Sequence, residues 1–197
     1  MNASLLPRHH CVGLSSRAFH VLRSSLERDN GLQTAAYLQE AGFASGEDLY
    51  NAFVSRVRDV YQVESPADLD LAFLSEALSA HFGEFGWGSL RSTPLSAAVL
   101  ALDSDDWAEA APEGGGQYPS CHLTSGLLSD FLGRMSGEPV AVMEVECRSR
   151  GDDRCRFLVG SPESLAIVYN RMVHGASYTE AARSWEAAST PEEPDIA

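Results

Sequence analysis

Residues 121–163 read CHLTSGLLSDFLGRMSGEPVAVMEVECRSRGDDRCRFLVGSPE, and this stretch determines the fold expected for the C-terminal half of the chain. Leu123, Leu127 and Phe131 recur at helical spacing, which predicts an amphipathic helix over residues 122–134. A Ser-Gly pair follows the last apolar position, and glycine commonly ends a helix there. The first third of the stretch is therefore expected to be one helix.

The second half of the stretch has the pattern of a β-hairpin. Residues 139–147 and 155–160 are rich in β-branched and apolar side chains, and Gly151 lies in the short turn that joins them. Ser161 and Pro162 then supply a capping residue and a proline at the first helical position. We therefore expect a hairpin followed directly by another helix, which runs to about residue 173.

The rest of the chain is predicted to be mostly helical, with short strands before the quoted stretch. The expected elements are helices over 15–28, 32–41, 47–60 and 66–82, strands over 91–93 and 95–102, and a last helix from 178 to about 185. Gly42 is predicted to end the second helix, and the three glycines at 114–116 to form a flexible loop. The fold class is therefore a mixed α/β (α+β) arrangement, in which N-terminal helices precede an antiparallel sheet flanked by helices.

The chain is expected to form one domain with two loose ends. Its 197 residues suffice for a single core. We expect a flexible N-terminus over residues 1–14 and a single domain over 15–187, with a helical N-terminal part (15–65) and a core (66–187). The acidic, proline-bearing residues 188–197 are expected to be a disordered tail.

The charge of the chain argues against nucleic-acid binding. The formal net charge is −14, and the 14 basic residues are all arginine. Binding to phosphate requires a positive field, and the one local candidate is the arginine group Arg148, Arg150, Arg154 and Arg156, with acidic residues among its members. We therefore expect neither a nucleic-acid partner nor an anionic lipid surface. No apolar run approaches the roughly 20 residues of a membrane span, and the N-terminus has no signal-peptide core, so a cytoplasmic protein is expected.

Three of the four cysteines lie close enough in sequence to form a metal site. Cys147 and Cys155 bracket the predicted hairpin, and Cys121 precedes a helix whose N-terminal dipole lowers the pKa of a nearby thiol. In a cytosolic protein such clusters bind metal more often than they form disulfides, and zinc prefers four tetrahedral ligands. The alternatives are three free thiols or a disulfide between Cys147 and Cys155. Cys11 stands apart, beside His9 and His10.

The residues alone leave the fourth ligand open among Glu144, Glu146, His122 and water. Side chains alternate along a strand, so Glu144 and Glu146 would share one face and Cys147 would lie on the other. A strand that brings Glu144 and Cys147 to one ion must therefore bulge or twist near its end.

The quoted stretch resembles the vinyl-4-reductase (4VR) domain. The shared signature is a cysteine that opens a helix, then E-x-E-C, then G-D-x-x-C-x-F, and the likeness is close over residues 118–165 and looser at the FGWG of 85–88. The family includes the sensory domains of phenol-responsive activators and a protein of bacteriochlorophyll synthesis. The resemblance implies a structural Zn²⁺ held by Cys121, Glu144, Cys147 and Cys155, with Glu146 in reserve, and therefore a zinc-pinned hairpin.

The resemblance also implies a 4VR-like domain, often dimeric, that holds a small hydrophobic ligand near the zinc-bearing lobe. In the phenol sensors a histidine and a tryptophan hold the hydroxyl, and we assign these roles to His81 and Trp107. The other candidates for the pocket are Phe82, Phe85, Trp87, Tyr118, His122 and Phe131. Core packing is the competing interpretation for each aromatic ring.

Three functions follow as hypotheses. The first is a zinc-stabilised sensor module for a small hydrophobic or aromatic ligand, which signals through a homodimer or a protein partner. The second is an enzyme or accessory factor that acts on vinyl tetrapyrroles, although the sequence has no dinucleotide fingerprint and no defensible catalytic arrangement, so an enzyme is the less favoured interpretation. The third is a scaffold, because the same fold group includes subunits of vesicle-tethering complexes.

Overall fold

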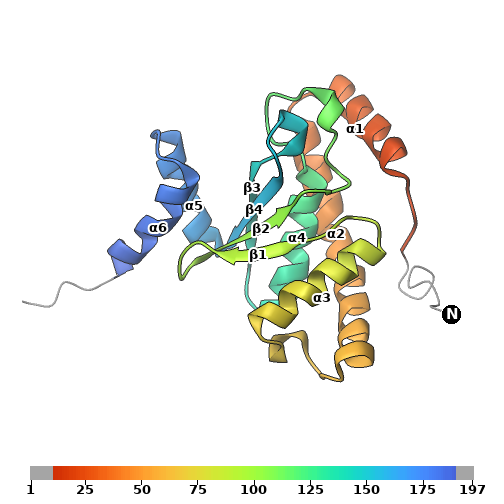
Figure 1. The fold of residues 1–197 in the computed structure, drawn as a ribbon. Coiled ribbons are helices and arrows are strands. Elements are labelled where there is room, and N and C mark those ends of the chain that lie inside the picture. Colours follow the sequence, from red (N-terminus) through yellow and green to blue (C-terminus); the bar gives the residue numbers. More distant parts are fainter. Residues whose placement is uncertain (1–10, 190–197) are drawn as a thin grey trace, which may run out of the picture.

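Four antiparallel strands form the sheet on which the helices pack (Figure 1). In this computed structural model, which describes residues 11–189, the strands are β1 (Arg91–Pro94), β2 (Val99–Ser104), β3 (Ala141–Glu146) and β4 (Cys155–Gly160). Their order in the sheet is β1-β2-β4-β3, so β4 lies in the middle and pairs with both β2 and β3. The predicted hairpin of β3 and β4 is therefore part of a larger sheet.

Six α-helices surround the sheet. They are α1 (Ser16–Asn30), α2 (Gln33–Arg56), α3 (Leu71–Glu84), α4 (His122–Ser136), α5 (Pro162–Val173) and α6 (Tyr178–Ser189). A π-helical turn (Val57–Tyr61) extends α2, and 3-10 turns occupy Pro66–Asp68, Pro112–Gly114 and Arg148–Arg150. Helices together with an antiparallel sheet confirm the predicted α+β class.

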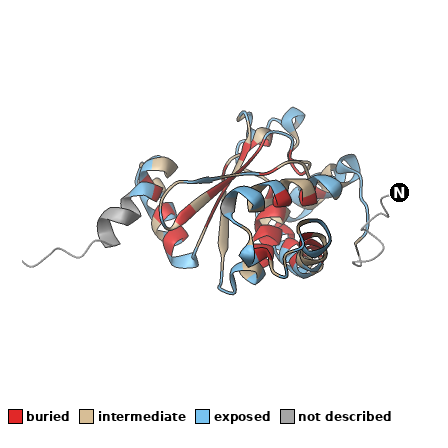
Figure 2. Ribbon diagram, turned by 60° about the horizontal axis from the view of Figure 1, so that its bottom comes forward, coloured by how far each residue is buried: buried red, intermediate tan, exposed pale blue. Residues whose placement is uncertain are grey.

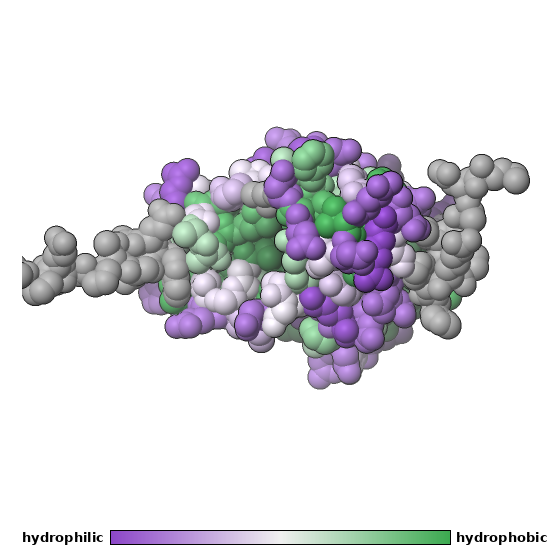
Figure 3. All heavy atoms as spheres, turned by 90° about the horizontal axis from the view of Figure 1, so that it is seen from below, coloured by the Kyte–Doolittle hydropathy of each residue, from purple (hydrophilic) through white to green (hydrophobic). Residues whose placement is uncertain are grey.

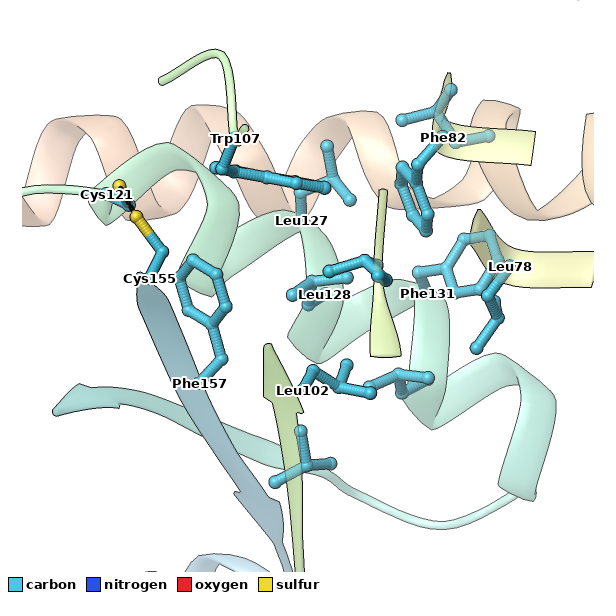
Figure 4. Close-up of a cluster of buried hydrophobic side chains, with 14 of the residues drawn as sticks. Leu78, Phe82, Leu102, Trp107, Cys121, Leu127, Leu128, Phe131, Cys155 and Phe157 are labelled. Carbon is cyan, nitrogen blue, oxygen red and sulfur yellow. Dashed lines mark hydrogen bonds between the residues drawn. The ribbon is translucent and has the colours of Figure 1, made fainter. Parts of the chain in front are cut away.

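The two faces of the sheet bury two separate apolar clusters. The larger cluster lies between the sheet and α2, α3 and α4, and Figure 4 shows Trp107, Phe131 and Phe157 within it. The smaller cluster lies beneath the C-terminal helices and includes Leu158, Leu165 and other residues of α5 and α6. Figure 2 shows the buried residues concentrated where helices and strands meet. Because side chains alternate along each strand, both faces of β4 are apolar.

The prediction that Gly42 ends a helix is wrong. Residues 33–56 form one continuous helix, and the predicted break at 42–46 lies within it. Gly42 and Gly46 are both buried against α4, where a Cβ on Gly42 would come within 1.9 Å of the carbonyl oxygen of Leu123. Glycine is present because α2 and α4 approach closely, and tertiary packing outweighs its weak helix propensity.

The remaining boundaries shift by a few residues. The helix predicted from residue 66 begins at Leu71, because Pro66–Asp68 forms a separate turn and the side chain of Asp70 caps α3 by accepting from Phe73 N at 2.9 Å. β2 begins at Val99 because residues 95–98 form a turn. The last helix continues through Ser189, so it includes the first two residues of the predicted tail. Residues 1–10 and 190–197, with the expected flexible ends and the His9–His10 pair, lie outside the described residues.

Apolar surface gathers in a hollow beside the C-terminal helices, as seen from below in Figure 3. Partly buried apolar side chains of this region include Leu95, Met143 and Met172. Among the residues that the structure describes, no helix combines the length and hydrophobicity needed to cross a bilayer.

Candidate metal centre and adjoining pocket

Three sulfur atoms and one carboxylate converge where β3, β4 and α4 meet. Cys121 is the residue that precedes α4, Glu144 lies in β3, Cys147 follows β3, and Cys155 begins β4. One ligand atom from each of these four side chains lies within 4.8 Å of the others. The three cysteines are fully buried. The structure thus brings together the four residues that the sequence pointed to.

A β-bulge makes this convergence geometrically feasible. The register of β3 against β4 shifts between Glu144, which pairs with Phe157, and Glu146, which pairs with Arg156. An extra residue in one strand re-aims the side chains that follow it. As a result Glu144 and Cys147 reach the same cluster, whereas Glu146 contacts Tyr178 and Arg154 instead. The expectation that Glu144 and Glu146 share a face is therefore wrong, and the expected bulge is confirmed.

The sulfur spacing fits a tetrahedral ion better than it fits a disulfide. Cys121 Sγ lies 3.9 Å from the Sγ atoms of both Cys147 and Cys155 (the Cys155 contact is drawn in Figure 4). A tetrahedron with zinc–sulfur bonds of about 2.3 Å separates its sulfur atoms by about 3.8 Å. A disulfide requires about 2.05 Å, and all three cysteines are free thiols.

The carboxylate of Glu144 offers a further sign that the donor set fits a metal ion. Its Oε2 accepts a hydrogen bond from the backbone N–H of Cys121 at 2.8 Å, which fixes the side chain. Its Oε1 is buried and has no hydrogen-bond partner among the described residues. A buried carboxylate oxygen without a partner is costly. An ion bound to Oε1 and the three sulfur atoms would remove that cost.

The four acidic groups also compete for negative charge. Burial raises the pKa of Cys121, and burial together with the charge of Cys147 raises the pKa of Glu144 to about 9. Hydrogen bonds from Cys121 and Cys155 lower the pKa of Cys147. Without a cation the cluster therefore holds its negative charge mainly on one sulfur. A divalent cation favours the deprotonated form of every ligand.

A second buried carboxylate holds the start of α4. The Oε1 of Glu109 accepts from Leu123 N at 2.9 Å, and its Oε2 accepts from Thr124 N at 2.7 Å and from the Thr124 hydroxyl. The same hydroxyl oxygen accepts from Trp107 Nε1 at 2.6 Å. Glu109 thereby satisfies two of the N–H groups that a helix start leaves without partners, directly beside Cys121.

Glu109 predicts a specific pH dependence of stability. Burial raises its pKa from 4.5 to about 7, although bonds from Thr124 and Leu123 and the charge of Arg23 act in the opposite direction. Between these two values the folded protein holds a proton that the unfolded chain has lost, so stability falls as pH rises. From pH ~4.5 to ~7 the free energy of unfolding should fall by about 3 kcal/mol more in the wild type than in Glu109→Gln. Urea unfolding at several pH values measures this, and parallel profiles would contradict it.

Helix α1 packs over the same region through polar contacts. Arg23 NH1 donates to the backbone oxygen of Glu109 at 3.0 Å and to Ser120. His20 Nε2 lies 3.0 Å from the carbonyl oxygen of Ala108. Arg23 is 6% exposed, so these contacts fix α1 above residues 108–120.

A pocket of about 460 Å³ opens between α1, α2 and the segment after α3. It is lined by residues from five parts of the chain: Cys11, Val12, Gly13, Leu14, Ser16, Phe19, Ala41, Ser45, Asp48, Leu49, Phe85, Gly86, Trp87, Ala108, Glu109 and Leu123. Glu109 and Leu123 belong to the network that holds the start of α4. The pocket and the thiol–carboxylate cluster therefore share one structural element.

The predicted ligand-binding residues are distributed between this pocket, the core and the surface. Phe85 and Trp87 line the pocket. Trp107 lies behind Trp87, with ring centroids 5.7 Å apart, and His81 lies behind Phe85 at 5.0 Å. His81 is fully buried among aromatic rings that include Phe53, Phe82 and Phe131.

The other two predicted ligand-binding residues lie outside the pocket lining. Tyr118 is 76% exposed. His122 is half-buried, and burial, with the charge of Arg23, lowers its pKa. Neither is adjacent to the aromatic side chains that line the pocket.

Sequence reasoning missed the two carboxylates of the pocket, Asp48 and Glu109. Asp48 reads as an ordinary polar position of a helix, and only the fold places it opposite Trp87. Glu109 carried a signal, because it is a lone charge within the apolar run WAEAAP of residues 107–112. A charge in such a run indicates a buried partner or a functional role.

Carboxylates neutralise most of the arginine group noted in the sequence. Arg150 pairs with Asp152 at 2.6 Å, Arg154 with Glu146 at 2.8 Å and Arg156 with Asp103 at 2.6 Å. The guanidinium of Arg156 also donates to the hydroxyl of Tyr178. These side chains connect strands and helix α6 and leave little unpaired positive charge.

The sequence of this region matches a known domain family. Residues 102–161 match the family model of the vinyl-4-reductase domain. The chain carries a vinyl-4-reductase domain. The match begins within β2 and ends just after β4, so this domain includes all four residues of the thiol–carboxylate cluster together with Glu109. The comparison with curated proteins yielded no match.

Solved structures share the fold well beyond the matched residues. The phenol-responsive sensory domain of the transcription activator PoxR, solved with phenol, is 19% identical, with a TM-score of 0.57 over 92% of this chain and 84% of that chain. A trafficking protein particle complex subunit 3 from Naegleria fowleri, covalently bound to palmitic acid, is 17% identical, with a TM-score of 0.56 over 74% and 91%. A vinyl-4-reductase family protein from Methanocaldococcus jannaschii is 21% identical, with a TM-score of 0.46 over 62% and 66%. At these identities the likeness shows a shared fold.

Proposed function

We propose that this protein is a small-molecule sensor module. In this proposal a small hydrophobic or aromatic ligand binds in the 460 Å³ pocket, and one zinc ion stabilises the structure beside it. The observation that carries the proposal is the shared start of α4, where Cys121 belongs to the thiol–carboxylate cluster and Leu123 lines the pocket. The PoxR domain, which has the same fold, was solved with phenol.

The zinc would be structural. Cys121, Glu144, Cys147 and Cys155 would be its ligands, and four protein ligands leave no open coordination position. It would join the β3–β4 hairpin to the start of α4. Since the larger apolar cluster contains residues from α2, α3 and β2 as well, we expect loss of the ion to disorder this region without unfolding the whole domain.

The pocket has the size and lining of a small-ligand site. Ligand pockets typically enclose about 300–1,000 Å³ and combine apolar walls with a few polar groups. Here Phe19, Leu49, Phe85 and Trp87 supply apolar walls. Helix α1 covers one side, so a ligand that changes how α1 packs would alter an exposed helical surface. We propose that this surface transmits the signal to a second copy or to a protein partner in the cytoplasm, from one domain over residues 15–187.

Filling the pocket should abolish binding. A tryptophan at position 41 would occupy the pocket, because Ala41 lines it, whereas Ala44 in the same helix is exposed and does not. With 2-phenylethanol as probe, quenching of tryptophan fluorescence should saturate in the wild type and in Ala44→Trp, and affinity should fall at least about tenfold in Ala41→Trp. Isothermal titration calorimetry provides the same comparison without relying on the added fluorophore.

Two outcomes would contradict the proposal. Equal binding by Ala41→Trp and Ala44→Trp would place the ligand elsewhere. If a panel of small aromatic alcohols fails to bind the wild type, and the protein instead co-purifies with a protein partner, the scaffold function would replace the sensor.

A further inference from the structure

The pocket combines aromatic rings with negative charge. Phe19, Phe85 and Trp87 line it, and its two charged residues, Asp48 and Glu109, are both acidic. No lysine, arginine or histidine occurs among the described lining residues. Two serine hydroxyls, of Ser16 and Ser45, complete the polar lining.

Neither carboxylate is neutralised by a neighbouring base. Within residues 11–189, no arginine or histidine forms an ion pair with Asp48 or Glu109. The N-terminus of α1 also borders the pocket, but the side chain of Ser15 already caps it by accepting from Ala18 N. The chain as a whole carries a net charge of −14. Local and long-range fields therefore both attract cations and repel anions.

The two carboxylates differ in what they can still bind. Both oxygens of Glu109 already accept hydrogen bonds from Leu123 and Thr124. Asp48 lies in α2 on the opposite wall and is half-buried. Asp48 is thus the carboxylate best placed to pair with a ligand.

We propose that the pocket selects organic cations with an aromatic body, such as aryl-alkylammonium ions, over carboxylates of the same shape. The inference rests on the proposed function and defines its ligand class. The ammonium group pairs with Asp48, while Trp87, Phe85 and Phe19 stack on the ring or face the cation. Aromatic faces attract ammonium groups, and tryptophan does so best. Fatty acids and aryl carboxylates are excluded, since they would place an anion beside two carboxylates.

Three probes of matched shape test the inference. They are 2-phenylethylamine, 2-phenylethanol and phenylacetate, which at pH 7 are cationic, neutral and anionic. Titration of the full chain followed by calorimetry should give affinities about fivefold higher for the amine than for the alcohol, and about 25-fold higher than for the acid. Raising the salt concentration should reduce these ratios, because a partly exposed ion pair is screened.

Substitution locates the selectivity. Asp48→Asn should reduce the ratio of amine to alcohol affinity about fivefold. Asp59→Asn removes the same charge from an exposed position outside the pocket and should leave the ratio as in the wild type. Circular dichroism of both variants verifies that the fold is retained.

The outcomes separate the two levels of the argument. If the three probes bind equally well, or the acid binds best, the charge selectivity is refuted while the sensor function stands. If the amine preference survives in Asp48→Asn, the assignment of the pairing carboxylate is refuted. If none of the probes binds, the pocket is not the ligand site, and the proposed function falls together with the inference.

Discussion

Replacement of Glu144 by glutamine is expected to remove zinc from the purified protein, whereas replacement of Glu146 by glutamine is expected to retain it. The two residues are two positions apart in β3, but the bulge sends only Glu144 toward the three sulfur atoms. A neutral amide is a far weaker zinc ligand than a carboxylate. Loss of a hydrogen-bond partner outside the ligand set alone weakens metal binding about 10- to 100-fold, so we expect more than 100-fold for Glu144→Gln.

Metal analysis of freshly reduced protein measures this result directly. Wild type and Glu146→Gln should contain one zinc per chain, and Glu144→Gln should contain much less than one after dialysis against a weak chelator. Cobalt substitution adds a second readout, because thiolate ligation gives charge-transfer bands that Cys147→Ser should diminish. Zinc-free wild-type protein, or equal zinc in both glutamine variants, would overturn the assignment.

The same variants should differ in stability. Loss of the ion leaves a cluster of buried thiols and a carboxylate oxygen without a partner, which costs on the order of 3–5 kcal/mol. In a chain of this length each kcal/mol corresponds to about 2–4 °C in Tm, so Tm should fall by about 10 °C. Glu146→Gln loses its ion pair with Arg154 and its contact with Tyr178, and we expect a smaller decrease of a few degrees.

The cluster could be predicted from the sequence because it depends on scarce residue types. Cys121, Cys147 and Cys155 occur at informative positions, before a helix and on either side of a turn. The choice of Glu144 came from the family resemblance, because simple strand alternation favours no ligand pair with Cys147. A bulge depends on how the whole sheet packs, so its need was predictable but its position was not.

The pocket could not be predicted in the same way. Its walls come from five segments that the fold alone brings together, and Asp48 and Phe19 carry no pattern that marks them. The aromatic residues Phe85 and Trp87 were identified because exposed or half-buried rings are scarce. Trp107, Phe131 and His81 share that signal but lie in the core behind the pocket, since sequence does not distinguish a ring that lines a pocket from one that supports it.

Gly42 shows why local propensity misplaced a helix end. A glycine between two helical patterns reads as a stop, but here it permits close contact between α2 and α4. The two meanings make opposite predictions for substitution. If glycine is only a weak helix former, alanine stabilises the helix by about 1 kcal/mol; if it is a contact point, alanine destabilises the fold.

Gly126→Ala is therefore expected to destabilise the protein by about 3 kcal/mol or more, against the helix-propensity rule. Gly126 lies within α4, and a Cβ there would come within 1.9 Å of the carbonyl oxygen of Gln39 in α2. That oxygen belongs to the backbone, so relief requires the two helices to move apart. Overpacking of a tight core typically costs 1–3 kcal/mol, and a backbone clash lies at the upper end.

Gly83→Ala in α3 is the matched control. A Cβ at Gly83 would have no heavy atom closer than 3.9 Å, so alanine should be neutral or stabilise the protein by up to about 1 kcal/mol. Urea unfolding followed by circular dichroism gives both free energies. Opposite signs for the two substitutions would establish that close helix contact, rather than chain flexibility, requires glycine in α4; a stabilised Gly126→Ala would mean that α2 and α4 do not approach as closely as described, and that the pocket wall formed by Ala41 and Leu123 lacks its support.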